Sequence, residues 1–302
     1  MSQTSSGECP MPDRSLESQP RAVVKGAGDM ASGVALSLHR AGFAVAMTEI
    51  DRPTVVRRTV SFAQAIYEGA ASVEGTEAVV VAPSGIEDTL ARGTIAVIVA
   101  EDAEEVLGMV RPVLLVDAII AKRNLGTHIG DAPAVVALGP GFVAGRDVHA
   151  VIETRRGHDL GRVLLEGSAH ENTGVPGDVG GFTWQRVVRS PAAGAFRTVA
   201  DIGDLVKAGD VVGYVGEEPV RVALDGVLRG LLHTGLDVTE GFKLGDVDPR
   251  GDPSRCLTAS DKARVIGGSV LEAACALLGG VRFEPSRAVA RHTADGRQED
   301  GR

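Results

Sequence analysis

This chain has few aromatic residues, few cysteines and no long apolar run. Phe, Trp and Tyr make up 3% of the 302 residues, so a hydrophobic core must be built mainly from Val, Ala, Leu and Ile. The three cysteines, Cys9, Cys256 and Cys275, are too few and too scattered for a disulfide framework, and no two of them have metal-ligand spacing. We therefore predict neither disulfides nor a metal site.

Positive charge and targeting signals are also scarce. The formal net charge is −9, which argues against a nonspecific nucleic-acid binder, because such binding needs a basic surface. No apolar run approaches the roughly 18 residues of a membrane span. The first twenty residues lack the apolar stretch of a signal peptide. We expect a soluble cytoplasmic protein that binds neither nucleic acid nor a membrane.

A glycine turn near the start of the chain is its most informative feature. An apolar strand predicted over 22–25 runs into a turn at Gly26 and Gly28, and a helix is predicted over 30–41. This G-x-G-x-x-G/A spacing lets the backbone approach a phosphate at a helix N-terminus. The turn predicts a bound dinucleotide, and its candidate contacts are Gly26, Gly28, Asp29, Met30, Ala31 and Gly33.

An acidic residue follows at the position expected for ribose binding. Glu49 ends a strand predicted over 43–49, where a carboxylate binds the ribose hydroxyls of NAD. Arg52, Arg57 and Arg58 come next and could instead hold the 2′-phosphate of NADP. The residues therefore leave NAD and NADP open.

Short apolar strands alternate with helices up to about residue 118, a pattern typical of a doubly wound parallel sheet. Further strands are predicted over 95–99, 113–117 and 134–138. We predict an α/β plus β protein with a Rossmann-like parallel sheet. Its predicted parts are a disordered tail (1–20), a nucleotide-binding domain (21–120), a Gly/Arg-rich ligand or interface segment (121–186), a β-barrel (187–250), a C-terminal helical segment (251–283) and a second disordered tail (284–302).

The all-β segment contains a pseudo-repeat. Ser190-Pro191-Ala192-Ala193-Gly194 and Ala223-Leu224-Asp225-Gly226 each precede a second glycine-rich turn. This pattern resembles the flattened barrel of biotinyl and lipoyl carrier domains. Such carriers bear a modified lysine between the two halves, but this chain has Glu217-Glu218-Pro219-Val220-Arg221 there. We therefore predict a structural or docking module.

Two further polar clusters are candidate ligand sites. One is placed at the C-terminal end of the 113–117 strand, where open α/β sheets bind ligands; it comprises Asp117, Lys122, Arg123 and Asn124. The other begins with an anion-binding nest at Gly139 and Gly141. Its cationic side chains could clamp a phosphate, and its histidines and carboxylate could act as general acids or bases; they are His149, Glu153, Arg155, His158 and Arg162. A polar interdomain interface is the alternative.

Cys256 is a weaker catalytic candidate. It precedes a helix predicted over 261–278, where a helix N-terminus and a lysine would lower the pKa of a thiol. A buried structural cysteine is the alternative.

At these motifs the chain resembles the YqeB-type accessory proteins of selenium-dependent molybdenum hydroxylases. The nucleotide-binding part of those proteins is similar to the Rossmann domain of xanthine-dehydrogenase accessory factors. The matching segments are 24–33, 59–69, 116–127, 138–163, 245–251 and 260–273. The resemblance implies a maturation factor that binds a nucleotide or the molybdopterin cofactor, with NAD(P) or a molybdopterin dinucleotide as the candidate ligands. The implied partners are the apo-hydroxylase or other maturation proteins, and a homo-oligomer is open.

Two other functions are compatible with the residues. The turn together with His149, Glu153 and His158 would suit an NAD(P)-dependent oxidoreductase. The β segment, which lacks the carrier lysine at its midpoint, would suit a noncatalytic docking protein. The sequence does not decide whether the protein is an enzyme.

Overall fold

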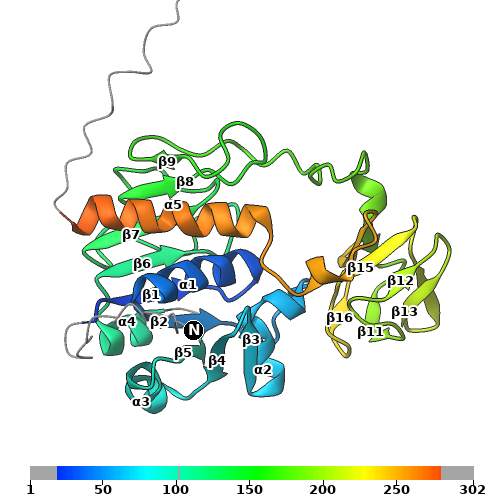
Figure 1. Cartoon of the computed structure of the whole chain (residues 1–302), viewed down its shortest axis with the longest axis horizontal. Coiled ribbons are helices and arrows are strands. Elements are labelled where there is room, and N and C mark those ends of the chain that lie inside the picture. Colours follow the sequence, from blue (N-terminus) through cyan, green and yellow to red (C-terminus); the bar gives the residue numbers. More distant parts are fainter. Residues whose placement is uncertain (1–18, 101–102, 280–302) are drawn as a thin grey trace, which may run out of the picture.

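The computed structural model describes residues 19–100 and 103–279, and its centre is a nine-stranded mixed sheet (Figure 1). Its order is β3-β4-β5-β2-β1-β6-β7-β8-β9. The strands are β1 (Arg21–Lys25), β2 (Ala44–Glu49), β3 (Ala70–Val73), β4 (Thr76–Val80), β5 (Ile95–Val99), β6 (Leu114–Asp117), β7 (Ala134–Leu138), β8 (Ala150–Ile152) and β9 (Val163–Leu164). Pairing is parallel from β4 to β8 and antiparallel at the two edges, β3–β4 and β8–β9.

Both faces of this sheet are covered by helices, which explains its unbroken apolar strands. Side chains that alternate along a strand, such as Val23 and Val24, enter cores on opposite faces. Helices α1 (Asp29–Ala41) and α5 (Asp261–Leu278) cover one face and lie side by side in Figure 1. Helices α3 (Ile86–Ala91) and α4 (Glu104–Val110) contribute to the core on the other. The short α2 (Ala65–Glu68) leads into β3.

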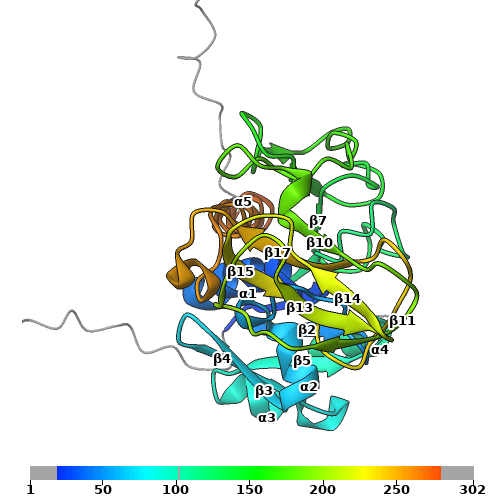
Figure 2. The same ribbon diagram turned by 90° about the vertical axis from the view of Figure 1, so that its right-hand side faces the viewer.

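The β-module, residues 187–248, consists of two four-stranded antiparallel sheets around its own apolar core. Figure 2 shows this module from the side that faces away from the nine-stranded sheet. The first sheet has the order β10-β17-β15-β12 and the second β14-β13-β11-β16. The strands are β10 (Val187–Arg189), β11 (Gly194–Thr198), β12 (Leu205–Val206), β13 (Val211–Val215), β14 (Glu218–Arg221), β15 (Gly226–Leu231), β16 (Asp237–Val238) and β17 (Lys243–Asp248).

The predicted fold class is wrong in two respects. The Rossmann-like parallel sheet is instead a mixed sheet, and the Gly/Arg-rich segment supplies its strands β7, β8 and β9. The lipoyl-like barrel is instead two separate sheets. Strands of two or three residues, such as β9, carry too little periodicity to reveal their pairing, which explains the first error. Most individual elements, among them β1, β5, β7 and α5, lie where the sequence predicts them.

Other predictions concern residues at the ends of the chain. The tail predicted over 1–20 lies outside the described residues except for residues 19 and 20, and the tail over 284–302 lies wholly outside them. Within 19–100 and 103–279, no helix combines the length and hydropathy needed to cross a membrane.

Candidate functional site

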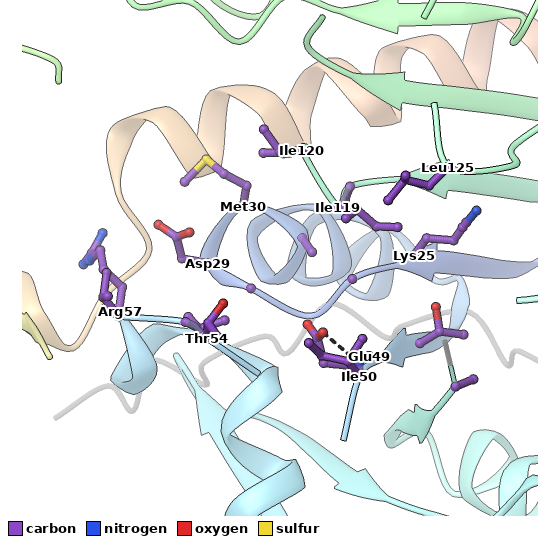
Figure 3. A pocket seen from close by; sticks show the side chains of 18 of the residues that line it. Lys25, Asp29, Met30, Glu49, Ile50, Thr54, Arg57, Ile119, Ile120 and Leu125 are labelled. Atoms are coloured by element: carbon purple, nitrogen blue, oxygen red, sulfur yellow. Dashed lines mark hydrogen bonds between the residues drawn. The ribbon is translucent and has the colours of Figure 1, made fainter. Parts of the chain in front are cut away.

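A cavity of about 500 Å³ opens at the carboxyl ends of β1, β2 and β6. Strand β1 pairs with β2 on one side and β6 on the other, so the chain connections diverge here. Such a divergence point is where open α/β sheets bind ligands. Figure 3 shows Met30, Ile119 and Ile120 to one side of the β1–α1 turn, and Glu49, Ile50 and Thr54 to the other. We call this cavity the turn pocket.

The β1–α1 turn is held close to its neighbours by glycine. Gly26 has φ +90°, its N–H donates to Thr48 O at 2.8 Å, and a Cβ there would lie 3.3 Å from Ala118 O. Gly28 is the N-cap of α1, and a Cβ on it would meet Val55 at 3.5 Å, an ordinary contact distance. Among the described residues no hydrogen bond uses the N–H groups of Gly28, Asp29 or Met30. Open backbone donors at a helix N-terminus suit an anion.

Glu49 is fixed beside this turn. Its Oε2 accepts a hydrogen bond from Ala27 N at 2.9 Å and its Oε1 one from Ile50 N at 2.9 Å. The side chain is half-buried and lines the turn pocket. Each carboxylate oxygen keeps a further lone pair, so Glu49 can still accept from a ligand hydroxyl.

The walls of the turn pocket carry solvent-exposed aliphatic side chains. Ile50, Ile119 and Leu125 are 43%, 40% and 47% exposed. Exposed apolar side chains of this size around a polar turn suit a flat ring. Burial of the apolar faces of such a ring contributes binding free energy where hydrogen bonds do not.

A buried polar network lies next to the turn pocket. Lys25 Nζ donates to Thr127 Oγ1 at 2.7 Å, and Thr127 Oγ1 donates to Asp117 Oδ2 at 2.6 Å. Lys25 Nζ is also 3.7 Å from Asp117 Oδ2. Asn124 accepts from the N–H groups of Gly126 and Thr127 and so closes the loop after β6. Asp117 and Asn124 thus shape the loop, whereas Lys122 and Arg123 are exposed on it.

Two of the three arginines that follow Glu49 bond to the β-module. Arg52 Nη2 donates to Gly235 O at 2.6 Å, and Arg58 Nε donates to Leu231 O at 2.7 Å. Arg57 Nη2 donates to Arg255 O at 3.1 Å. These contacts place no arginine against the Glu49 carboxylate.

The predicted nest around Gly139 is filled by the protein itself. Gly139 N donates to Ile152 O at 2.9 Å, and a Cβ on Gly139 would lie 2.7 Å from Thr154 Oγ1. A Cβ on Gly141 would lie 2.6 Å from the backbone of Arg123. The predicted cluster of Asp117, Lys122, Arg123 and Asn124 and the predicted cluster that begins at Gly139 therefore contact each other through their backbones.

Glu153 organises a separate site. Its carboxylate accepts from Arg155 N at 2.6 Å, from His170 N at 2.8 Å and, at 2.7 Å, from His170 Nδ1 in its protonated tautomer. Burial alone would raise the pKa of Glu153, but these hydrogen bonds lower it below its ordinary value. Arg155, His158 and His170 line a cavity of about 270 Å³ beside it.

Four predicted residues lie apart from any shared centre. His149 Nδ1 accepts from Val135 N at 3.0 Å, at the opposite end of β8 from Glu153. Arg162 is exposed and pairs with Asp159 at 2.9 Å. Gly33 packs against Ala263 of α5. Cys256 is buried, and burial raises the pKa of its thiol, which does not favour a reactive thiolate.

Two residues near these cavities, His170 and Arg229, belong to none of the predicted clusters. Arg229 carried a signal, because it interrupts the apolar run Val227-Leu228-Arg229-Gly230-Leu231. His170 lies more than 100 residues from the glycine turn, and local sequence patterns do not reveal such distant neighbours.

Comparison with known proteins identifies a relative among curated proteins. The chain is 53% identical over 257 residues to "Uncharacterized protein YqeB" of Escherichia coli K12, a match that covers 85% of this chain and 47% of that protein. The resemblance to YqeB-type proteins is confirmed. The chain spans about half the length of this curated relative. No family model matches the chain.

Solved structures give weak similarities. A succinylglutamate desuccinylase/aspartoacylase of Rhodobacter sphaeroides is 16% identical, with a TM-score of 0.24 and coverage of 76% of this chain and 86% of that chain. An aspartoacylase family protein of Mesorhizobium loti is 12% identical, with a TM-score of 0.24 and coverage of 76% and 84%. The ectoine utilization protein EutE of Ruegeria pomeroyi is 12% identical, with a TM-score of 0.21 and coverage of 77% and 58%. At these TM-scores the superpositions assign neither a fold nor a reaction to this chain.

These comparisons correct the predicted function. The sequence relative is described as uncharacterized and the three structures as a desuccinylase/aspartoacylase, an aspartoacylase family protein and an ectoine utilization protein. None of these descriptions names molybdenum, selenium or cofactor maturation. The prediction of a maturation factor for a molybdenum hydroxylase is therefore not supported by any of these comparisons and does not stand, and the geometry of the turn pocket is the remaining basis for a function.

Proposed function

We propose that the turn pocket binds the adenosine diphosphate part of a dinucleotide, with NAD preferred over NADP. The observation that carries this proposal is the open position at Gly28, where a Cβ would have room, next to backbone N–H groups without partners among the described residues. A pyrophosphate at this point would accept hydrogen bonds from the first turn of α1. The cavity volume of about 500 Å³ lies within the range of small-molecule sites.

Glu49 supports the preference for NAD. Its carboxylate sits at the end of β2, where it can accept hydrogen bonds from the two ribose hydroxyls. A 2′-phosphate would instead bring a second negative charge beside it. Of the three arginines that could offset that charge, Arg52 and Arg58 donate to carbonyls of the β-module, and Arg57 donates to Arg255 O.

Titration calorimetry with NAD, NADP and ADP tests the proposal. We expect NAD and ADP to bind and NADP to bind at least about tenfold more weakly than NAD, a difference of about 1.4 kcal/mol. The variant Gly28→Ala should weaken NAD binding by about tenfold or more, because its methyl group occupies the space that the pyrophosphate needs. The variant fits the fold, since the added Cβ meets only Val55 at 3.5 Å.

Gly108→Ala is the matched control, because Gly108 lies in α4 and a Cβ there meets nothing within 4 Å. It should bind NAD as the wild type does. Glu49→Gln should narrow the gap between NAD and NADP, because it removes the repelling charge. The proposal fails if the wild type binds neither NAD nor ADP, or if Gly28→Ala binds NAD as tightly as the wild type.

A further inference from the structure

A second cavity, of about 240 Å³, adjoins the turn pocket and shares Asp29, Met30 and Arg57 with it. It lies where α1, α5 and the β-module come together. Most of its charged side chains are basic, although the whole chain has a net charge of −9. We call it the cationic pocket, and it is lined by Asp29, Met30, Arg57, Arg156, Gly177, Val179, Arg186, Arg229, Asp246, Ser260 and Lys262.

Neighbouring carboxylates neutralise part of this positive charge. Arg186 pairs with Asp246 at 2.7 Å, and Arg156 pairs with Asp261 at 2.7 Å. Arg229 is 3.3 Å from Asp248, but that carboxylate already accepts two hydrogen bonds from the side chain of Arg250. Among the described residues, Arg57 and Lys262 are in no ion pair. The pocket therefore holds more positive than negative charge.

Two guanidinium groups in this pocket each keep a nitrogen without a hydrogen-bond partner. Arg57 and Arg229 are 7% and 8% exposed, and the Nε atom of each is buried without an acceptor among the described residues. Leaving such a donor unsatisfied in a buried position is costly. A bulge in β15, where the register with β17 shifts between Leu228 and Gly230, sets the direction of Arg229. The fold thus brings two incompletely bonded cations to one cavity.

Lys262 adds a third cation from the first turn of α5. No hydrogen bond or ion pair of its side chain is present within residues 19–100 and 103–279. Burial lowers the pKa of Lys262, and the nearby charge of Arg156 lowers it further. Burial likewise lowers the pKa of Arg57, and the nearby charge of Arg229 lowers it further. These like charges repel one another, and an anion between them would relieve that repulsion.

We infer that the cationic pocket is a second ligand site, which binds a tetrahedral oxyanion of the phosphate or sulfate class. Guanidinium groups bind such oxyanions through paired hydrogen bonds, and a lysine adds a point charge. At about 240 Å³ the pocket has room for this group. The cavity continues past Arg156 and Lys262 into a third one of about 540 Å³, so the oxyanion can be free or the end of a small metabolite. This inference does not rest on the proposed dinucleotide, although the two cavities share Asp29, Met30 and Arg57.

Calorimetry with inorganic phosphate and sulfate, at constant ionic strength set with chloride, tests this site. We expect the wild type to bind both oxyanions and Lys262→Gln to bind them about tenfold more weakly, the loss typical of one charge-assisted hydrogen bond. Lys262→Arg, which keeps the charge, should retain most of the affinity. Glycerol phosphate in place of phosphate identifies the source: tighter binding indicates a metabolite and weaker binding a free ion.

Two controls separate this site from the turn pocket. Lys207→Gln removes an exposed lysine of the β-module and should leave phosphate binding unchanged. Gly28→Ala, designed to block the turn pocket, should retain phosphate binding, whereas Lys262→Gln should retain NAD binding. Absence of phosphate binding by the wild type, or equal binding by wild type and Lys262→Gln, would overturn the inference. Loss of phosphate binding in Gly28→Ala alone would also overturn it, because phosphate would then occupy the turn.

Discussion

Asp248 is a buried carboxylate that makes the stability of the β-module depend on pH. Its side chain is fully buried and accepts hydrogen bonds from Arg250 at 2.6 and 2.8 Å and from Arg229 at 3.3 Å. Burial would raise the pKa of Asp248, but the arginine contacts lower it from 3.8 to about 2. The protonated side chain would lose these charge-assisted bonds, so the native state favours the ionised form.

The sign of the resulting pH dependence is set by that shift. A folded pKa below the unfolded one stabilises the protein at pH values above about 4, and this contribution disappears as the pH falls toward about 2. The shift is worth about 2 kcal/mol at neutral pH. We expect Asp248→Asn to lower the free energy of unfolding at pH 7 by at least this amount. Urea unfolding at pH 7, 4 and 2.5 should show the gap to wild type narrowing with acid.

Asp237→Asn is the matched control for this experiment, since Asp237 is exposed on β16 and forms no hydrogen bond through its side chain among the described residues. It should match the wild type at every pH. A constant gap between wild type and Asp248→Asn from pH 7 to pH 2.5 would contradict the assignment.

At the scale of single residues, the sequence predicted the contacts that are local. Gly26, Gly28 and Glu49 line one cavity because the turn and the next strand are close in the chain. The sequence did not predict that Arg229 and Lys262, which are more than 190 residues away in the chain, lie in the same region. A strand bulge and a helix start orient these two side chains, and neither feature leaves a repeating pattern.

Helices α1 and α5 come close enough for their backbones to touch. A Cβ on Gly33 would lie 2.7 Å from Ala263 O, and one on Gly267 would lie 2.4 Å from Gly33 O. Glycine at both positions therefore sets the distance between the helices. Because α1 begins at the turn pocket, this packing also supports the site.

Gly267→Ala should force these helices apart. We expect a loss of about 1–3 kcal/mol in the free energy of unfolding, the cost typical of an overpacked interior. Gly268→Ala, one residue later, is the matched control: a Cβ there meets nothing within 4 Å, so helix propensity should stabilise it by about 0.5–1 kcal/mol. Urea unfolding of the two variants measures both values. Equal stability of the pair would show that the helices can separate without cost.

Elements were predictable where their apolar pattern is long. The five-residue strands β1, β5 and β7 and the 18-residue α5 agree with their predicted ranges to within one residue. The segment 58–68, whose apolar spacing is helical, forms two 3-10 turns followed by α2, since Arg58 donates to Leu231 O of the β-module and Thr59 donates to Cys256 O. Tertiary contacts there override helical spacing.

At the scale of the whole molecule, the nine-stranded sheet and the β-module have separate apolar cores. Hydrogen bonds and a ring stack join the two parts. Leu231 N donates to Val56 O at 2.7 Å, and Arg58 Nε donates to Leu231 O at 2.7 Å. Tyr67 stacks on His233 with ring centroids 3.8 Å apart. The sequence did not predict this interface, because each contact joins residues more than 160 positions apart.

We expect the wild type to unfold in one calorimetric transition, because this interface couples the two cores. The double variant Arg58→Gln/Tyr67→Leu removes from the interface a hydrogen bond of a charged group and a ring stack, which together are worth roughly 2–4 kcal/mol. It also removes the hydrogen bond from the Tyr67 hydroxyl to Pro53 O, which lies outside the interface. The β-module should then unfold at a lower temperature than the sheet. Arg21→Gln removes an exposed pair with Glu87 and a 3.4 Å hydrogen bond to Val110 O, neither of which involves the β-module, and should keep a single transition.

Ligand binding provides a second measurement of this coupling. Lys243 of β17 lines the turn pocket together with Gly28 and Val55. A dinucleotide there would therefore contact both the β-module and the part of the chain that forms the nine-stranded sheet. At a concentration of 100 times its Kd, a ligand stabilises the folded state by about 2.7 kcal/mol, which is comparable to the interface removed. NAD should therefore bring the two transitions of the double variant back toward one. If NAD raises only the sheet transition and leaves the β-module transition in place, the β-module is not part of the binding unit.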